Sequence, residues 1–251
     1  MTEPIAVLAD IHANIWALDA VFEDAEKRKV KTFLNLGDIL YGPLRPRQTY
    51  DRLRSENVAL TICGNQDRLI AGATANNLRT NPTLSFVLRD LGEEPIRWLA
   101  QLPKTAIYAN EILLCHGSPS SDEVYLLEAT TSGQPLVKED ICIVEQLRGV
   151  HQPVILCGHS HLPRLVELST GQLVVNPGSV GVPAYEVGEP VPHRMETFAP
   201  HASYAILEKI AAGWMVSFHR VPYHHGAAAV QAESLGRKDW ARNITRGRME
   251  R

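Results

Sequence analysis

The sequence predicts an α/β layered protein. Short apolar runs bounded by turn residues alternate with amphipathic helical patterns in the first half of the chain, and two hairpin patterns follow in the second half. Such alternation is typical of a sheet with helices on its faces, whereas the hairpins indicate a second, partly antiparallel sheet. The 251 residues are 45% hydrophobic and 21% charged, which is the balance of a globular protein that buries a large core.

Five apolar runs are predicted to be buried strands, because each is short and is followed by polar or glycine residues. They are residues 5–9, 32–36, 58–62, 112–115 and 154–157. Two hairpins are predicted around the turns Ser-Thr-Gly and Ala-Ala-Gly. Their arms are residues 164–168 with 172–175, and 203–210 with 214–221.

Helices are predicted at residues 13–29, 83–91, 94–102 and 138–147. Asn81 followed by Pro82 is typical of a helix cap and a first helical residue. The segment 183–202 is rich in proline and poor in apolar residues, so we interpret it as a long ordered loop and a candidate lid. The segment 226–251 is expected to form a helical tail.

Composition and charge argue against several classes of protein. A net charge of −3 and an aromatic content of 6% are unlike those of a dedicated nucleic-acid binder. No apolar run approaches the length of a membrane span, and the first residues lack the pattern of a signal peptide. The four cysteines are widely spaced and are expected to be reduced, buried thiols, which indicates a cytoplasmic protein.

The C-terminal tail is basic. Residues 237–251 carry six basic residues against two acidic ones. Such a helix could contact RNA, lipid or an acidic partner, but a solvated helix face is the interpretation we favour.

A side chain that can bind metal follows each of the five predicted strands, often beside a glycine. These residues are Asp10 and His12, Asp38, Asn65, His116, and His159 and His161. Sites in α/β proteins gather at the carboxyl ends of strands. Mixed carboxylate and imidazole ligands suit Mn, Fe, Co, Ni or Zn. Because this set is too large for one ion with an open position, it predicts two ions that share a bridging carboxylate.

The order D-x-H, G-D, G-N, H-G and G-H-x-H resembles the calcineurin-like metallophosphoesterases. The segments LADIHANIWALDAV, LGDILYGP and NPGSVG look like the bacterial phosphodiesterase-type branch of this family. SYAIL, FHRVPY and the terminal RGR also resemble its longer members, so the resemblance covers nearly the whole chain. It implies one domain over residues 1–251, folded as a four-layer αββα sandwich of two mixed sheets flanked by helices.

The resemblance also implies a binuclear centre of two divalent ions, which are Mn, Fe, Ni, Co or Zn. One ion would be bound by Asp10, His12, Asp38 and His161, and the other by Asp38, Asn65, His116 and His159. Asp38, Asn65 and His116 are the expected catalytic residues. A hydroxide shared by the two ions would attack phosphorus in line with the leaving oxygen. The NPGSVG loop would either orient the ligand histidines or simply form a tight turn.

One residue departs from the family pattern. Gln66 stands where many members carry a histidine that is thought to protonate the leaving group, and an amide has no titratable proton. We therefore expect aryl esters, diesters with a good leaving group or phosphoanhydrides to be better substrates than alkyl monoesters. His193 is either an alternative acid or a solvated loop residue. Asp67 either orients a ligand or is a helix N-terminal charge, and Arg45 and Arg47 either contact phosphate or are solvated.

Three functions remain open at this point. The favoured one is a cytoplasmic phosphodiesterase that acts on a small-molecule phosphate ester. The second is a nucleotide anhydride hydrolase or a nuclease, although the chain lacks the long basic groove expected for duplex DNA. The third is a non-catalytic binding scaffold, like the retromer scaffold subunit of the same fold, but all seven ligand positions are filled here. The lid and the C-terminal hairpin are candidate surfaces for a homo-oligomer.

Overall fold

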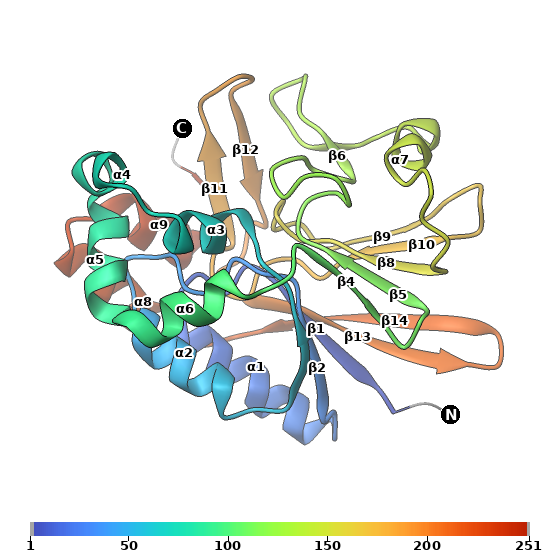
Figure 1. Cartoon of the computed structure of the whole chain (residues 1–251), viewed down its shortest axis with the longest axis horizontal. Helices are drawn as coiled ribbons and strands as arrows, with labels where there is room; N and C mark the ends of the chain where they lie inside the picture. Colours follow the sequence, from blue (N-terminus) through green and yellow to red (C-terminus); the bar gives the residue numbers. More distant parts are fainter. Residues whose placement is uncertain (1–2, 250–251) are drawn as a thin grey trace.

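Two five-stranded mixed sheets form the centre of the molecule in this computed structural model, which describes residues 3–249 (Figure 1). The two residues at each end of the predicted domain, including the last two of the predicted tail, lie outside this range. The first sheet, in the order β14-β13-β1-β2-β3, contains β1 (Ile5–Leu8), β2 (Thr32–Asn35), β3 (Val58–Thr61), β13 (Ala202–Ile210) and β14 (Gly213–Val221). The second, in the order β4-β5-β8-β10-β9, contains β4 (Thr105–Tyr108), β5 (Ile112–Cys115), β8 (Val154–Leu156), β9 (Arg164–Glu167) and β10 (Leu173–Asn176).

Helices and two small hairpins complete the described chain. The helices are α1 (Ile15–Lys27), α2 (Pro46–Arg54), α3 (Asn65–Ala71), α4 (Ala75–Thr80), α5 (Pro82–Leu91), α6 (Glu93–Ala100), α7 (Asp140–Gln146), α8 (His225–Ser234) and α9 (Lys238–Arg246). The small hairpins are β6 (Glu128–Ala129) with β7 (Leu136–Val137), and β11 (Ala184–Val187) with β12 (His193–Glu196). Asn81 caps α5 through its side chain, and Pro82 is the first helical residue, as predicted.

Alternation along the strands divides the core into layers. Val7 points between the two sheets and shares a core with Leu156 of β8. Its neighbour Leu8 points to the opposite face and packs with Leu18 of α1. On the outer face of the second sheet, Ile155 packs with the buried side of α7. The order helix, sheet, sheet, helix confirms the four-layer αββα sandwich.

Parallel pairing in the middle of each sheet brings several strand ends to one edge. β1, β2 and β3 are parallel neighbours, and so are β5, β8 and β10. The antiparallel hairpins predicted at β9–β10 and β13–β14 are confirmed by their pairing. The loops that leave the carboxyl ends of the parallel strands therefore face one another across the sandwich.

The segment 183–202 is a correction to the sequence analysis, because it is not a continuous loop. It contains the hairpin β11–β12, in which Ala184 pairs with Glu196 and Val187 with His193. The prolines lie before, between and after these two strands, so they interrupt no ladder hydrogen bond. That this hairpin acts as a lid stays a prediction.

Two further expectations concern the cysteines and membrane-spanning helices. Cys63, Cys115 and Cys157 are buried free thiols, whereas Cys142 is exposed on α7. The expectation of four buried thiols was therefore wrong for Cys142, which lies on the solvent side of an amphipathic helix. Within residues 3–249, no helix combines the length and the apolar character needed to cross a membrane.

Candidate metal centre

The strand-end residues that the sequence singled out lie together in the structure. In chain order they are Asp10 and His12 after β1, Asp38 after β2, Asn65 at the start of α3, His116 after β5, and His159 and His161 after β8. Each follows a parallel strand, so the topology alone delivers them to the same edge of the sandwich.

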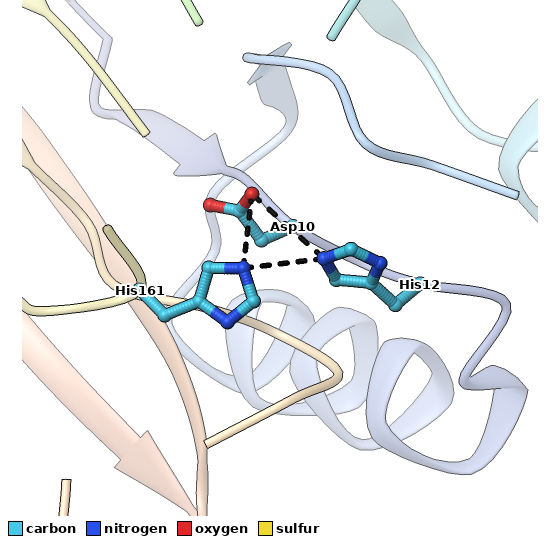
Figure 2. A group of neighbouring side chains, drawn as sticks. All are labelled: Asp10, His12 and His161. Atoms are coloured by element: carbon cyan, nitrogen blue, oxygen red, sulfur yellow. Dashed lines mark hydrogen bonds and ion pairs between the residues drawn. The ribbon is translucent and has the colours of Figure 1, made fainter. Parts of the chain in front are cut away.

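One group consists of Asp10, His12 and His161 (Figure 2). The Nε2 atoms of the two histidines are 3.2 Å apart. The Oδ1 atom of Asp10 lies 3.3 Å from Nε2 of His161 and 4.0 Å from Nε2 of His12. Three potential ligand atoms, supplied by both sheets, thus converge on one buried point.

The second group consists of Asp38, His116 and His159, with Asn65 beside it. Oδ2 of Asp38 lies 3.4 Å from Nε2 of His116, and Oδ1 of Asn65 lies 3.1 Å from the same nitrogen. Oδ2 of Asp38 is also 3.9 Å from Nε2 of His12, which belongs to the first group. Asp38 therefore stands between the two groups, where a bridging carboxylate would have to lie.

Backbone carbonyls fix the orientation of the histidine rings. Nδ1 of His12, His116 and His161 lies 3.0, 2.8 and 2.7 Å from the carbonyl oxygens of Tyr41, Leu36 and Val182, respectively. A carbonyl only accepts hydrogen bonds, so Nδ1 carries a proton in each ring and Nε2 is turned toward the centre. His159 is held the other way, with Nε2 3.2 Å from the carbonyl of Glu123, which leaves Nδ1 as its second ring nitrogen.

Electrostatics keep two of these rings neutral. Burial and the neighbouring His161 lower the pKa of His12. Burial and the charge of His116 lower the pKa of His159 to about 4. His116 differs, because burial alone would lower its pKa but Asp38 and Asp10 raise it to about 10. A cation that entered here would displace that proton.

The contacts of Asp10 are those expected of a metal ligand. Among residues 3–249, no donor hydrogen-bonds to its buried Oδ1, although Oδ2 accepts from the backbone N–H of His159. Nε2 of His161 faces this carboxylate, and Nε2 of His12 faces Nε2 of His161, so three atoms that can bind a metal point at one another. Such a buried arrangement is unfavourable unless a cation lies between the atoms. The donor set thus fits a metal.

The backbone at the site is unusual as well. Asp10, His12, Asp38, His159 and His161 have φ values of 54°, 49°, 54°, 66° and 60°. This left-handed region is rarely adopted by residues other than glycine, and each instance costs on the order of 1 kcal/mol. The left-handed residues bend each loop sharply after its strand. Strained residues clustered in this way point to a functional site.

Asp67 supports the ligand loops from behind. Its carboxylate accepts hydrogen bonds from the backbone N–H groups of Asp38, Ile39 and Gly64, at 2.8, 2.9 and 3.1 Å. It is fully buried, and burial together with the charge of Asp38 raises its pKa to about 7. Asp67 also lies in the first turn of α3, where it accepts from the N-cap residue Gly64. It therefore combines the two roles left open by the sequence, because it is a helix N-terminal charge and also positions Asp38.

The NPGSVG loop combines both of its predicted roles. Gly178 has a φ of 77° and makes the tight turn. Asn176 donates to the carbonyl of Gly158 and to Oγ of Ser160, which directly precede His159 and His161 in the G-H-x-H motif. Ser179 donates to the carbonyl of Asp10 at 2.8 Å. The turn thereby links the loop after β1 to the loop after β8.

Other candidates lie away from the centre. Arg47 forms ion pairs with Asp51 and Glu94, so it joins α2 to α6, and Arg45 is an exposed residue at the start of α2. Neither arginine has an observed contact with the ligand set.

His193 is buried rather than solvated, and its Nε2 lies 3.0 Å from the hydroxyl of Tyr125. Tyr125 and Tyr185 connect His193 to the site. Their hydroxyls are 3.0 Å apart, and Tyr185 donates to the carbonyl of His159 at 2.7 Å. The ring of Tyr125 also stacks on that of His159, with centroids 4.8 Å apart. His193 therefore ends a polar network behind the centre, where it positions the His159 loop.

A cavity of about 150 Å³ opens beside the ligands. Besides ligand residues and Gln66, it is lined by Tyr41, Tyr185, Trp240 and Asn243. These four were not singled out from the sequence. No local pattern marks them, since they reach the cavity only through tertiary packing.

The chain is similar in sequence and in fold to known proteins. The sequence profile of the calcineurin-like phosphoesterase superfamily domain matches residues 4–208. An uncharacterized protein of Methanocaldococcus jannaschii is 28% identical over 202 residues, which are 71% of this chain and 76% of that protein. The crystal structure of a metallophosphoesterase from Sphaerobacter thermophilus superposes with a TM-score of 0.75 at 26% identity, covering 98% of this chain and 100% of the other. Because the domain profile spans most of the residues that build both sheets and their ligand loops, the chain belongs to the calcineurin-like phosphoesterase superfamily.

Proposed function

We propose that this protein is a metal-dependent phosphodiesterase of the cytoplasm. The observation that carries the proposal is the convergence of Nε2 of His12, Nε2 of His161 and the unpaired, buried Oδ1 of Asp10 on one point, an arrangement that a cation would stabilise. We assign one divalent ion to Asp10, His12, Asp38 and His161, and a second to Asp38, Asn65, His116 and His159. When bound, such a pair of ions lowers the pKa of a water molecule and neutralises charge on the phosphoryl oxygens.

The chain's own residues would orient the ester. Asn65 directs its carbonyl oxygen to His116, so its amide N–H group remains to donate to a phosphoryl oxygen. Asp38 is held at two points: its backbone N–H donates to Asp67, and its Oδ1 accepts from the backbone N–H of Gln66. Its carboxylate therefore needs little reorganisation. Asp38, Asn65 and His116 are therefore the proposed catalytic residues.

The preference for a good leaving group rests on what the cavity lacks for acid catalysis. Gln66 can donate a hydrogen bond but cannot transfer a proton. Burial raises the pKa of Tyr41 and of Tyr185, so both phenols hold their protons. Esters whose leaving group is stable as an anion are favoured by such a site. Aryl esters meet this condition, whereas alkyl monoesters do not. The choice of a diester among aryl esters follows from the resemblance to the phosphodiesterase-type branch.

A paired assay tests the proposal. The protein is stripped of metal, Mn²⁺ is added, and hydrolysis of bis(4-nitrophenyl) phosphate is compared with that of 4-nitrophenyl phosphate. Asp38→Asn serves as the blank, and Glu167→Gln, on the exposed face of β9, serves as the matched control. We expect the diester to be cut faster, and only with metal and Asp38. If neither ester is cut with Mn²⁺, Ni²⁺ or Co²⁺, the protein is not the enzyme proposed.

A further inference from the structure

Helix α9 forms one wall of the cavity at the ligand cluster. We propose that this wall, built around Trp240 and Asn243, is a subsite for one planar six-membered ring carried by the ester substrate. The inference rests on the proposed function, because it concerns the group attached to the phosphoryl centre. It assigns a role to the basic tail that the sequence left without one.

The helix is firmly held in place. Ala241 and Ile244 are buried in a small core with Ala13 and Leu44, from the loops after β1 and β2. Trp240 and Asn243 are three residues apart, so they share a face of the helix, and both line the cavity. Because Ala241 and Ile244 anchor α9 in this core, Trp240 and Asn243 are held at the cavity beside the ligand cluster.

Trp240 packs directly against the loop that carries His12. Their ring centroids are 5.9 Å apart with an interplanar angle of 77°, and the guanidinium of Arg237 lies 5.7 Å from the centroid of the indole. A Cβ at Gly42 would lie 3.1 Å from Cζ3 of Trp240 and 2.4 Å from the carbonyl oxygen of His12. Gly42 therefore permits this close packing, and the indole has a fixed place beside the centre.

Another part of the cavity wall comes from the segment around β11. Val182 and Ala184 supply apolar surface there, and the ring of Tyr185 has its centroid 4.5 Å from that of His161. Apolar and aromatic surface from β11 and α9 thus lines the same cavity as the ligand residues. Such a lining favours a flat apolar group over a hydrated one.

The volume and polarity of the cavity further restrict which ring it can bind. The cavity volume of about 150 Å³ is of the same order as that of an apolar protein cavity that takes up benzene, roughly 150 Å³. The ligand residues line part of this space, so the ring that it admits beside the phosphoryl group is a small one. Oε1 of Gln66 is buried and accepts no hydrogen bond from the described residues, so a donor on the ring would find a partner there.

The test compares two phosphonates that the enzyme cannot hydrolyse. Phenylphosphonate and methylphosphonate share the phosphonate group that would bind at the ions. They differ only in that one carries a phenyl ring and the other a methyl group. Their affinities for the Mn²⁺-loaded protein are measured by calorimetry. We expect phenylphosphonate to bind about tenfold more tightly. In Trp240→Ala, this ratio is expected to fall to roughly one to threefold.

Two further variants keep the outcome interpretable. Trp240→Leu retains apolar bulk against Ala13 and Leu44, so it decides the matter if Trp240→Ala does not fold, and it should also lower the ratio. Trp214→Leu is the matched control, because Trp214 lies on β14, where it packs beside Lys209. It should leave the ratio as in the wild type.

The failures can be told apart. If both phosphonates bind equally well to the wild type, or if neither Trp240 variant changes the ratio, the subsite is overturned while metal-dependent hydrolysis still supports the enzyme. If neither phosphonate binds and no ester is cut, the proposed function is overturned, and the subsite with it.

Discussion

At the scale of single residues, close backbone approach limits what the ligand loops tolerate. Gly64 has an ordinary φ of −89°, yet a Cβ there would lie 2.2 Å from Oδ1 of Asp38. We predict that Gly64→Ala lowers phosphodiester hydrolysis about 100-fold, because it displaces the carboxylate placed between the two ligand groups. Steady-state kinetics and metal content measured on the same preparation check this.

The matched control is Gly226→Ala, within α8, where an added Cβ meets nothing within 4 Å. This change should leave hydrolysis intact and raise the free energy of unfolding by up to about 1 kcal/mol. Equal activity of the two variants would contradict the steric argument.

Gln66 carries the second residue-scale prediction. Gln66→His places a titratable proton beside the cavity, so turnover of an alkyl phosphate should rise relative to that of an aryl phosphate, by roughly 10-fold or more. The ratio of the two kcat/KM values is the measurement. An unchanged ratio would mean that protonation of the leaving group does not limit the reaction.

At the scale of elements, α1 is tied to β13 by a charged contact that depends on pH. The hydroxyl of Tyr204 donates to Oδ2 of Asp24 at 2.7 Å, and Arg28 pairs with the same carboxylate. Burial raises the pKa of Asp24, but the hydrogen bonds from Arg28 and Tyr204 outweigh it and leave the pKa below the ordinary 3.8. The contact thus contributes stability above that pH and loses it as the pH falls through the folded-state pKa.

Asp24→Asn tests this linkage. The difference in free energy of unfolding between wild type and variant should be constant above about pH 5 and shrink in more acidic solution. Urea titrations at several pH values give the difference directly. A difference that does not change with pH would show that the carboxylate's charge has no part in the contact.

Prediction of the elements from sequence succeeded where the signal was local. The strand before Gly158 and His159 is marked by its apolar run and by the polar residues that follow it. The hairpin β11–β12 was missed because its prolines dominate the composition while lying outside both strands. The place of Trp240 was not predictable, since its contact with His12 joins opposite ends of the chain and depends on the packing of α9.

At the scale of the whole molecule, the proposed ions should stabilise the fold. Ligand binding to the folded state alone, at about 100 times the dissociation constant, adds roughly 2.7 kcal/mol. For a chain of this size, that corresponds to a rise in Tm of about 5–10 °C. Thermal unfolding followed by circular dichroism, with Mn²⁺ and then with a chelator, measures the shift. Asp38→Asn should show a much smaller one, and an equal Tm in all four conditions would contradict the binuclear assignment.

The left-handed backbone at five of the proposed ligands bears on what each loop requires of its residues. Glycine in place of any of these residues would relax the backbone of its loop, and at Asp10 and Asp38 it would also remove a buried carboxylate. The loop backbone therefore does not require the ligand side chains, and only the chemistry of the site does.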